Sequence, residues 1–116
     1  MEIKTLVLGH IHTNCYLLST DNAAVVIDPA FESAEVEEFL LKNSEKERMI
    51  LLTHAHFDHV SGVGRLKEKH PDAIVVVGVE DFPALSDAKL SAAADFGLPF
   101  YPCYADEAVK DGDILT

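Results

Sequence analysis

Residues 53–59 of this 116-residue chain read THAHFDH and place four metal-ligand side chains within six positions. The run directly follows an apolar stretch, residues 49–52, which has the length and continuity of a strand covered on both sides. Imidazole and carboxylate groups are ligands that suit zinc, iron and manganese. The run therefore predicts a metal-binding loop whose ligands are His54, His56, Asp58 and His59.

The spacing of these ligands indicates two groups. Alternate side chains of an extended segment lie on the same side, so His54 and His56 can bind one cation together. Asp58 and His59 fall where a helix is expected to begin, and a helix N-terminus favours a carboxylate. The bend between strand and helix lets this second group approach a second metal position.

The remaining pattern predicts a fold that mixes strands with two helices. Ser33 is placed to cap a helix that runs to Lys42, and a second helix is expected from Asp58 to His70, where Pro71 stops it. The first three strands should form an antiparallel meander that ends at Asp28. The expected strands are residues 3–8, 15–18, 23–27, 49–53 and 74–77.

The C-terminal third gives weaker signals. Residues 79–95 have a weakly helical pattern, and residues 97–103 read as loop. A turn at residues 111–112 leads into an apolar pair that resembles the start of a strand. We expect one domain over residues 1–116, truncated at this strand.

Composition limits the ligands and the compartment. The 9 basic and 20 acidic residues give a net charge of −11, which disfavours nucleic acid as a partner. No stretch reaches the roughly 18 apolar residues of a membrane span, and no signal peptide is recognisable, so a cytoplasmic location is expected. In that compartment Cys15 and Cys103 should be free thiols.

The pattern His54-x-His56-x-Asp58-His59 is similar to the signature of the metallo-β-lactamase superfamily. Residues 26–29, VIDP, resemble the strand of that family that ends in an aspartate near the metals. Residues 13–17, TNCYL, and 59–63, HVSGV, look like the glyoxalase II-like branch, the hydroxyacylglutathione-hydrolase type. The resemblance covers essentially the whole chain.

The resemblance implies the N-terminal half of an αββα sandwich, with a mostly antiparallel or mixed sheet and flanking helices. It implies two metals per complete site, with Zn²⁺ expected and Fe or Mn as alternatives. His54 and His56 would bind the first metal, and Asp58 and His59 the second. The remaining ligands, two histidines and a bridging aspartate, would come from a later segment, and by family order His70 is not one of them.

The complete site would hydrolyse a small thioester. Two cations would share a hydroxide that attacks the thioester carbonyl, and Asp58 would help to orient it. A mononuclear iron site that oxidises a persulfide is an alternative within the same superfamily. The net charge disfavours phosphodiester cleavage, and the lack of a secretion signal disfavours a β-lactamase.

A non-catalytic interpretation also stands. Half a sandwich leaves one apolar sheet face uncovered, which favours a homo-oligomer or a C-terminal half-domain as partner. For residues 1–116 alone we expect an incomplete site, so that activity belongs to the complete domain.

Four other polar residues of the sequence are candidates for lesser roles. His10 and His12 are expected at the surface or at a pocket edge, and Tyr16 is given no catalytic role. Asp28 is either an outer group that orients a ligand or a turn residue before Pro29.

Overall fold

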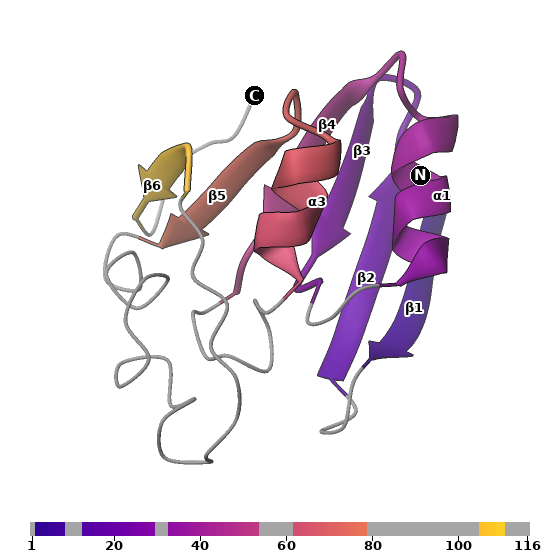
Figure 1. Cartoon of the computed structure of the whole chain (residues 1–116), viewed down its shortest axis with the longest axis horizontal. Coiled ribbons are helices and arrows are strands. Elements are labelled where there is room, and N and C mark those ends of the chain that lie inside the picture. Colours follow the sequence, from indigo (N-terminus) through magenta and orange to yellow (C-terminus); the bar gives the residue numbers. More distant parts are fainter. Residues whose placement is uncertain (1, 9–12, 30–32, 54–61, 79–104, 111–116) are drawn as a thin grey trace.

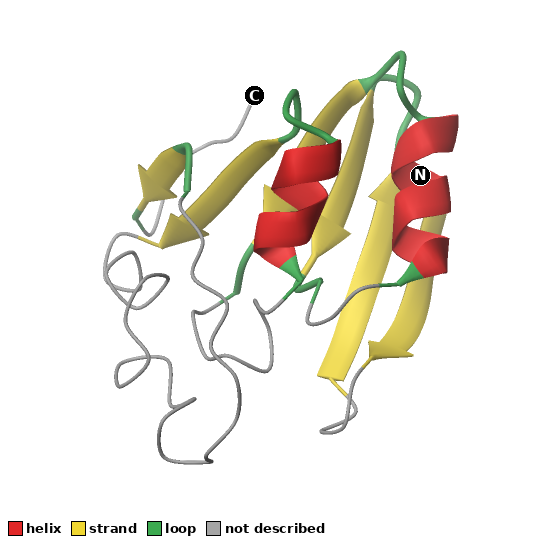
Figure 2. Cartoon of the chain, viewed as in Figure 1, coloured by secondary structure: helices red, strands yellow, loops and turns green. Residues whose placement is uncertain are grey.

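A six-stranded sheet carries two helices in the computed structural model, which describes residues 2–8, 13–29, 33–53, 62–78 and 105–110 (Figure 1). The strands follow one another across the sheet in chain order, from β1 at one edge to β6 at the other. Both helices lie on the same face of the sheet (Figure 2). The elements are β1 Glu2–Leu8, β2 Thr13–Ser19, β3 Ala23–Ile27, α1 Ala34–Lys42, β4 Glu47–Leu51, α3 Val63–Lys69, β5 Ile74–Gly78 and β6 Glu107–Val109.

The pairing of the strands changes from antiparallel to parallel at β3. β2 pairs antiparallel with β1 and β3, whereas β3–β4, β4–β5 and β5–β6 are parallel. A tight turn joins β2 to β3, and the Thr20 hydroxyl oxygen accepts hydrogen bonds there from the N–H groups of Asn22 (3.3 Å) and Ala23 (3.0 Å). Parallel neighbours need a crossover, which α1 supplies between β3 and β4 and α3 between β4 and β5. The predicted mixed α/β fold and antiparallel meander are confirmed.

The core lies between the sheet and the two helices. Alternate residues of each strand point to this side, because successive side chains of a strand face opposite ways. Val36 and Leu40 of α1, with Val63 and Leu66 of α3, close over them and are almost fully buried. The buried apolar strand residues on this side are Leu6, Cys15, Leu17, Ala24, Val26, Ile50, Val75 and Val77, whereas Val76 of β5 is fully buried on the opposite face.

The opposite face of the sheet is covered by no helix or strand within the described residues. Ile3 and Val7 of β1 are 61% and 60% exposed, and Ile74 of β5 is 41% exposed. Met49 and Leu51 of β4 are half-buried on this side. Within the described residues the helices cover only one face of β4, and the coverage of both faces at residues 49–53 stays a prediction.

The first helix begins and ends where the sequence predicts. Ser33 occupies the N-cap position, but its side chain makes no capping hydrogen bond. Glu35 and Glu37 lie in the first turn and Lys42 in the last, which matches the helix dipole at both ends. These charges favour the helix at both ends, although the expected side-chain cap is absent.

The second predicted helix is shorter in the structure, where α3 begins at Val63 and ends at Lys69 with His70 as its cap. The predicted start at Asp58 lies outside the described residues, as do the patterns at 79–95 and 111–115. The strand β6 was not predicted; its three residues pair with β5. No helix in the described part of the chain is long and apolar enough to cross a membrane.

Asp106 fastens β6 to the sheet and should make part of the stability depend on pH. Its carboxylate accepts hydrogen bonds from Lys67 Nζ (2.9 Å) and the Val75 N–H (2.8 Å). These two contacts, Lys67 first, hold the pKa of Asp106 below its ordinary value. Stabilisation is then present above the unfolded-state pKa and is lost as the pH falls through the folded-state pKa.

Asp106→Asn should therefore destabilise the protein by about 1 kcal/mol at neutral pH, a modest effect because solvent screens the exposed ion pair. Urea unfolding at neutral pH and near pH 3 measures both effects. The difference between variant and parent should shrink at the acid pH, and a constant difference would contradict the assigned role of the carboxylate.

Candidate metal centre

The predicted metal loop is held at both of its ends, although its ligands are not themselves described. His54, His56, Asp58 and His59 lie outside the described residues. Strand β4 leads into the loop through Leu52 and Thr53, and the chain leaves it through Gly62 into α3. The structure therefore describes the two segments that flank the four predicted ligands.

Asp28 holds the residue that precedes the first ligand. Its carboxylate accepts a hydrogen bond from the Thr53 N–H on Oδ1 (2.8 Å) and another from the Thr53 hydroxyl on Oδ2 (2.5 Å). The Asp28 side chain is only 3% exposed, so both bonds lie in a partly desolvated environment that strengthens them. Asp28 thus fixes the point at which the chain enters the ligand run.

Asp28 adopts a backbone conformation that few residues tolerate. Its φ is 55°, in the left-handed region, where aspartate and asparagine are accepted more readily than other non-glycine residues. Its N–H donates to the Leu51 carbonyl (3.1 Å), which continues the parallel pairing of β3 and β4 by one residue. Asp28 is therefore a turn residue whose side chain also holds Thr53, and its predicted role in orienting a metal ligand stays a prediction because the ligand run lies outside the described residues.

Two further backbone bonds hold the loop ends. The Leu52 N–H donates to the Val76 carbonyl of β5 (2.9 Å), and the Gly62 N–H donates to the Pro29 carbonyl (3.0 Å). The second bond joins the exit of the loop to the segment that follows β3. The entrance and the exit of the metal loop are both tied to residues 28–29.

Cys15 lies in the core beneath this anchor and is a free, buried thiol, as predicted. Burial and, secondarily, the negative charge of Asp28 raise the pKa of Cys15 to about 12. The thiol therefore stays protonated near neutral pH, where it is a poor nucleophile and a poor metal ligand. Cys103 lies outside the described residues.

The described residues include no group of three or more His, Cys, Asp or Glu side chains that could hold a metal ion. His10 and His12 lie outside them, and Tyr16 is 36% exposed on the open sheet face. The loop at 54–59 thus stays the candidate centre. The sequence interpretation missed Thr53 as the partner of Asp28, although Asp28 directly follows β3 and Thr53 is the second residue after the neighbouring strand β4.

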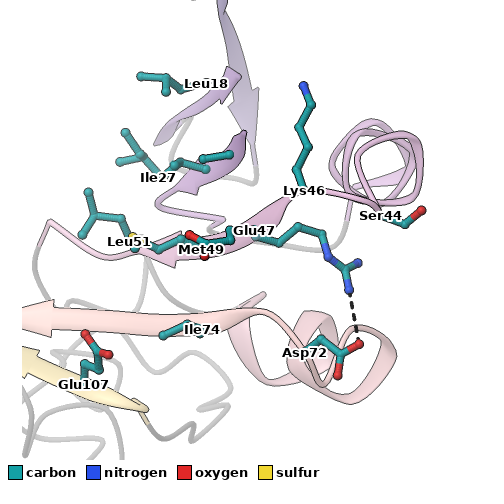
Figure 3. Close-up of a pocket in the computed structure, with 13 residues that line it drawn as sticks. Leu18, Ile27, Ser44, Lys46, Glu47, Met49, Leu51, Asp72, Ile74 and Glu107 are labelled. Atoms are coloured by element: carbon teal, nitrogen blue, oxygen red, sulfur yellow. Dashed lines mark ion pairs between the residues drawn. The ribbon is translucent and has the colours of Figure 1, made fainter. Parts of the chain in front are cut away.

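A hollow of about 700 Å³ lies on the open sheet face (Figure 3). Charged side chains stand at its rim, among them Lys46 and Asp72, and Asp72 lies 3.8 Å from Arg48 Nη2. The floor consists of side chains from β2, β3, β4 and β5. These apolar residues are Leu18, Val25, Ile27, Met49, Leu51 and Ile74.

A family model describes nearly the whole chain. Residues 8–115 match the metallo-beta-lactamase superfamily. The chain therefore belongs to the metallo-beta-lactamase superfamily, a metal-dependent class of proteins that is largely hydrolytic.

Two curated relatives share significant sequence identity with this chain. A hydroxyacylglutathione hydrolase of Francisella philomiragia is 42% identical over 76 residues, which are 65% of this chain and 30% of the relative. The probable metallo-hydrolase YqgX of Bacillus subtilis is 30% identical over 93 residues, 80% of this chain and 44% of the relative. The chain thus spans less than half the length of these two relatives.

Solved structures agree with the fold. The B3 metallo-beta-lactamase BLEG-1 superposes with a TM-score of 0.82 at 32% identity, covering 99% of this chain and 56% of that one. TTHA1623, solved in a di-iron-bound form, gives a TM-score of 0.79 at 34% identity, over 97% of this chain and 56% of that one. The expected family and fold class are confirmed.

Proposed function

We propose that this chain is part of a metal-dependent thioester hydrolase of the hydroxyacylglutathione type, and that it supplies half of the metal site. The observation that carries the proposal is the ligand run itself, mounted between β4 and α3 and anchored at its entrance by the Asp28–Thr53 pair. Similarity to the Francisella hydroxyacylglutathione hydrolase, at 42% identity over 76 residues, supports the choice of substrate class.

The donor chemistry of the loop fits the metals that the family implies. Three imidazoles and one carboxylate suit Zn²⁺, with Fe or Mn as alternatives. His54, His56, Asp58 and His59 would hold the cations. When bound, the cations would lower the pKa of a water molecule and polarise the thioester carbonyl.

The described residues would position the ligands and take no direct part in the reaction. The Asp28 carboxylate would keep the backbone of Thr53 fixed, so that His54 enters the site in one orientation. Gly62, bonded to Pro29, would hold the other end of the loop. Outside the described residues, Asp58 would hold the second metal and help to orient the attacking hydroxide.

Intact mass, metal content and activity of the protein purified from its own source test the proposal. A mass equal to that of the 116 residues would identify a genuine half-domain and direct attention to a partner chain. A larger mass would identify a fragment of a whole metallohydrolase, to be assayed with hydroxyacylglutathione. The proposal fails if the complete protein, loaded first with Zn²⁺ and then with Fe²⁺, leaves the thioester unhydrolysed.

A mononuclear iron persulfide dioxygenase is the second candidate. The di-iron-bound form of TTHA1623, at 34% identity, supports iron as a metal for this candidate, although that neighbour holds two irons and not one. Iron content combined with persulfide-dependent oxygen consumption would support this candidate. Zinc content and thioester turnover without oxygen consumption would exclude it.

A second sheet is the partner proposed for the open face. The face is apolar from β2 to β5 and hollowed in the middle, and apolar areas of this kind mark sites of association. The C-terminal half-domain is the proposed occupant, because this chain covers only 30% and 44% of the two relatives. A second copy of the chain is the other outcome to be tested.

Ile74→Lys should reduce association of the isolated chain without unfolding it. Ile74 is 41% exposed on the open face, so a lysine there can reach solvent at a cost within about 0.5 kcal/mol. Sedimentation velocity over a range of concentrations measures the association. Val75→Lys is the matched control on the opposite face, where the residue is fully buried and the charge should unfold the protein. Association that is unchanged in Ile74→Lys would argue against the open face as the interface.

A further inference from the structure

A buried contact between β4 and the end of α3 lies outside the site described above. Arg48 Nη1 lies 3.2 Å from Nδ1 of His70, whose residue is only 6% exposed. Arg48 is the second residue of β4, and His70 is the cap that follows α3. Strand β4 leads into the predicted metal loop and α3 follows it, so these two elements are the arms of the loop. The contact joins the start of β4 to the end of α3, far from the predicted ligands.

The chemistry of the pair assigns the protonation state of His70. Arginine only donates and is always charged in proteins, so Nδ1 of His70 must accept the hydrogen bond. The imidazole is then neutral, with its proton on Nε2. Protonation of Nδ1 would remove the acceptor and place two cations 3.2 Å apart in a buried position.

The backbone on both sides of His70 is fixed, so the ring cannot easily turn away. The His70 N–H donates to the Leu66 carbonyl (2.7 Å), and the His70 carbonyl accepts from the Ala73 N–H (3.0 Å). The Arg48 side chain is only 10% exposed and has Asp72 as a second, longer partner at 3.8 Å. Because both side chains are also largely buried, a break between the ring and the guanidinium would disturb the packing between β4 and the end of α3.

The charged groups around His70 come from three elements. Arg48 approaches from β4, Glu37 from α1, and Lys69 belongs to α3. Glu37 is itself bonded to Lys69 (2.5 Å), which offsets its attraction for an imidazolium. Burial first, and then the charge of Arg48, hold the pKa of His70 below its ordinary value near 6.5.

We infer that Arg48 and His70 form an acid-sensitive clamp that positions the metal loop by holding its two arms together. The inference rests on the proposed function of residues 54–59 as metal ligands. Acidification below neutrality opens the clamp and weakens metal binding more than titration of the ligand histidines does by itself. Arg48 and His70 act on the metal through the loop and are positioning residues.

The direction of the effect on folding follows from the lowered pKa. Between its ordinary pKa and its folded-state pKa, His70 binds more protons in the unfolded chain than in the folded one. The free energy of unfolding therefore falls as the pH drops below about 6.5 and levels off once the folded state is also protonated.

His70→Asn and Arg48→Met test the clamp. Asparagine places its Oδ1 near the position of Nδ1, so it keeps an acceptor for Arg48 but cannot be protonated in this range. Methionine keeps much of the apolar stem of Arg48 and removes its charge. Glu68→Gln, an exposed change in α3, is the matched control.

The first measurement is the NMR titration of the His70 ring in the metal-free protein. The parent midpoint should lie below 6.5, and Arg48→Met should move it upward. Glu68→Gln should leave it in place. A midpoint that Arg48→Met does not shift would overturn the clamp, whatever the loop binds.

The second measurement is the Zn²⁺ dissociation constant between about pH 7.5 and pH 5.5, where histidine titrates. At the upper pH the parent and His70→Asn should bind Zn²⁺ equally well. At the lower pH the parent should bind Zn²⁺ at least about fivefold more weakly than His70→Asn. Parallel curves would overturn the coupling of the clamp to the loop. Lack of Zn²⁺ binding at either pH would instead overturn the proposed metal site, and the metal-free titration separates the two failures.

Discussion

Asp28→Ala should destabilise the protein by about 4–7 kcal/mol and weaken metal binding by about 10–100-fold. The carboxylate of Asp28 receives two hydrogen bonds from Thr53, and bonds to a charged group are worth about 1.5–3 kcal/mol each. Alanine also tolerates the φ of 55° less well, which adds about 1 kcal/mol. Urea unfolding and Zn²⁺ titration measure the two effects.

Asp28→Asn removes the negative charge of this side chain but keeps its size and shape, so it separates the two contributions. Asparagine accepts the left-handed conformation and can still accept from the Thr53 N–H, so its cost should be well below that of alanine. Loss of the negative charge should lower the pKa of Cys15, while burial keeps that pKa above its ordinary value. Asp72→Ala is the control, because Asp72 is 90% exposed and its removal should cost under about 0.5 kcal/mol. Equal losses for Asp28→Ala and Asp28→Asn would refute the two-bond anchor.

Local apolar patterns were sufficient to predict the main packed elements of the described fold. The continuous apolar run at residues 23–27 and the helical spacing of Val36 and Leu40 correctly indicated β3 and the buried side of α1. These signals are local, because each residue pattern depends only on the geometry of its own strand or helix. The elements that carry the loop could thus be predicted from the sequence.

The bonds that hold the loop could not be predicted in the same way. Asp28 and Thr53 are 25 residues apart, and Arg48 and His70 are 22 apart. Contacts between residues so far apart in the chain can be predicted only when the register of the sheet is known. In this sheet Ile27 lies opposite Leu51. Strand β6 was missed for a related reason, since a three-residue strand is held by Asp106 and the edge of β5 and has almost no periodicity of its own.

The difference in burial between the two sheet faces also depends on which elements pack against the sheet, and a single strand does not reveal this. Ile50 and Met49 are adjacent and both apolar, yet Ile50 is fully buried while Met49 is half-buried. The sequence indicated an apolar strand but gave no means of telling which face the helices cover. That distinction matters for function, because the open face is where a second sheet is proposed to pack.

His56→Ala and Asp58→Ala should each abolish thioester hydrolysis by the complete protein. Each change removes a proposed metal ligand, one from each of the two metal positions that the spacing predicts. The loss of activity should exceed the roughly 10–100-fold effect typical of groups that only orient a ligand. Metal content after dialysis and the hydrolysis rate with hydroxyacylglutathione measure the two consequences.

His10→Ala is the matched control for these two variants, since it removes a histidine to which neither the spacing nor the family resemblance gives a ligand role. It should retain the parental metal content and rate. Near-parental turnover in His56→Ala or Asp58→Ala would show that the ligand run is not the catalytic centre. Loss of turnover with full metal content in Asp58→Ala would instead assign Asp58 to the handling of the attacking water, because the remaining donors would then suffice to hold the cations.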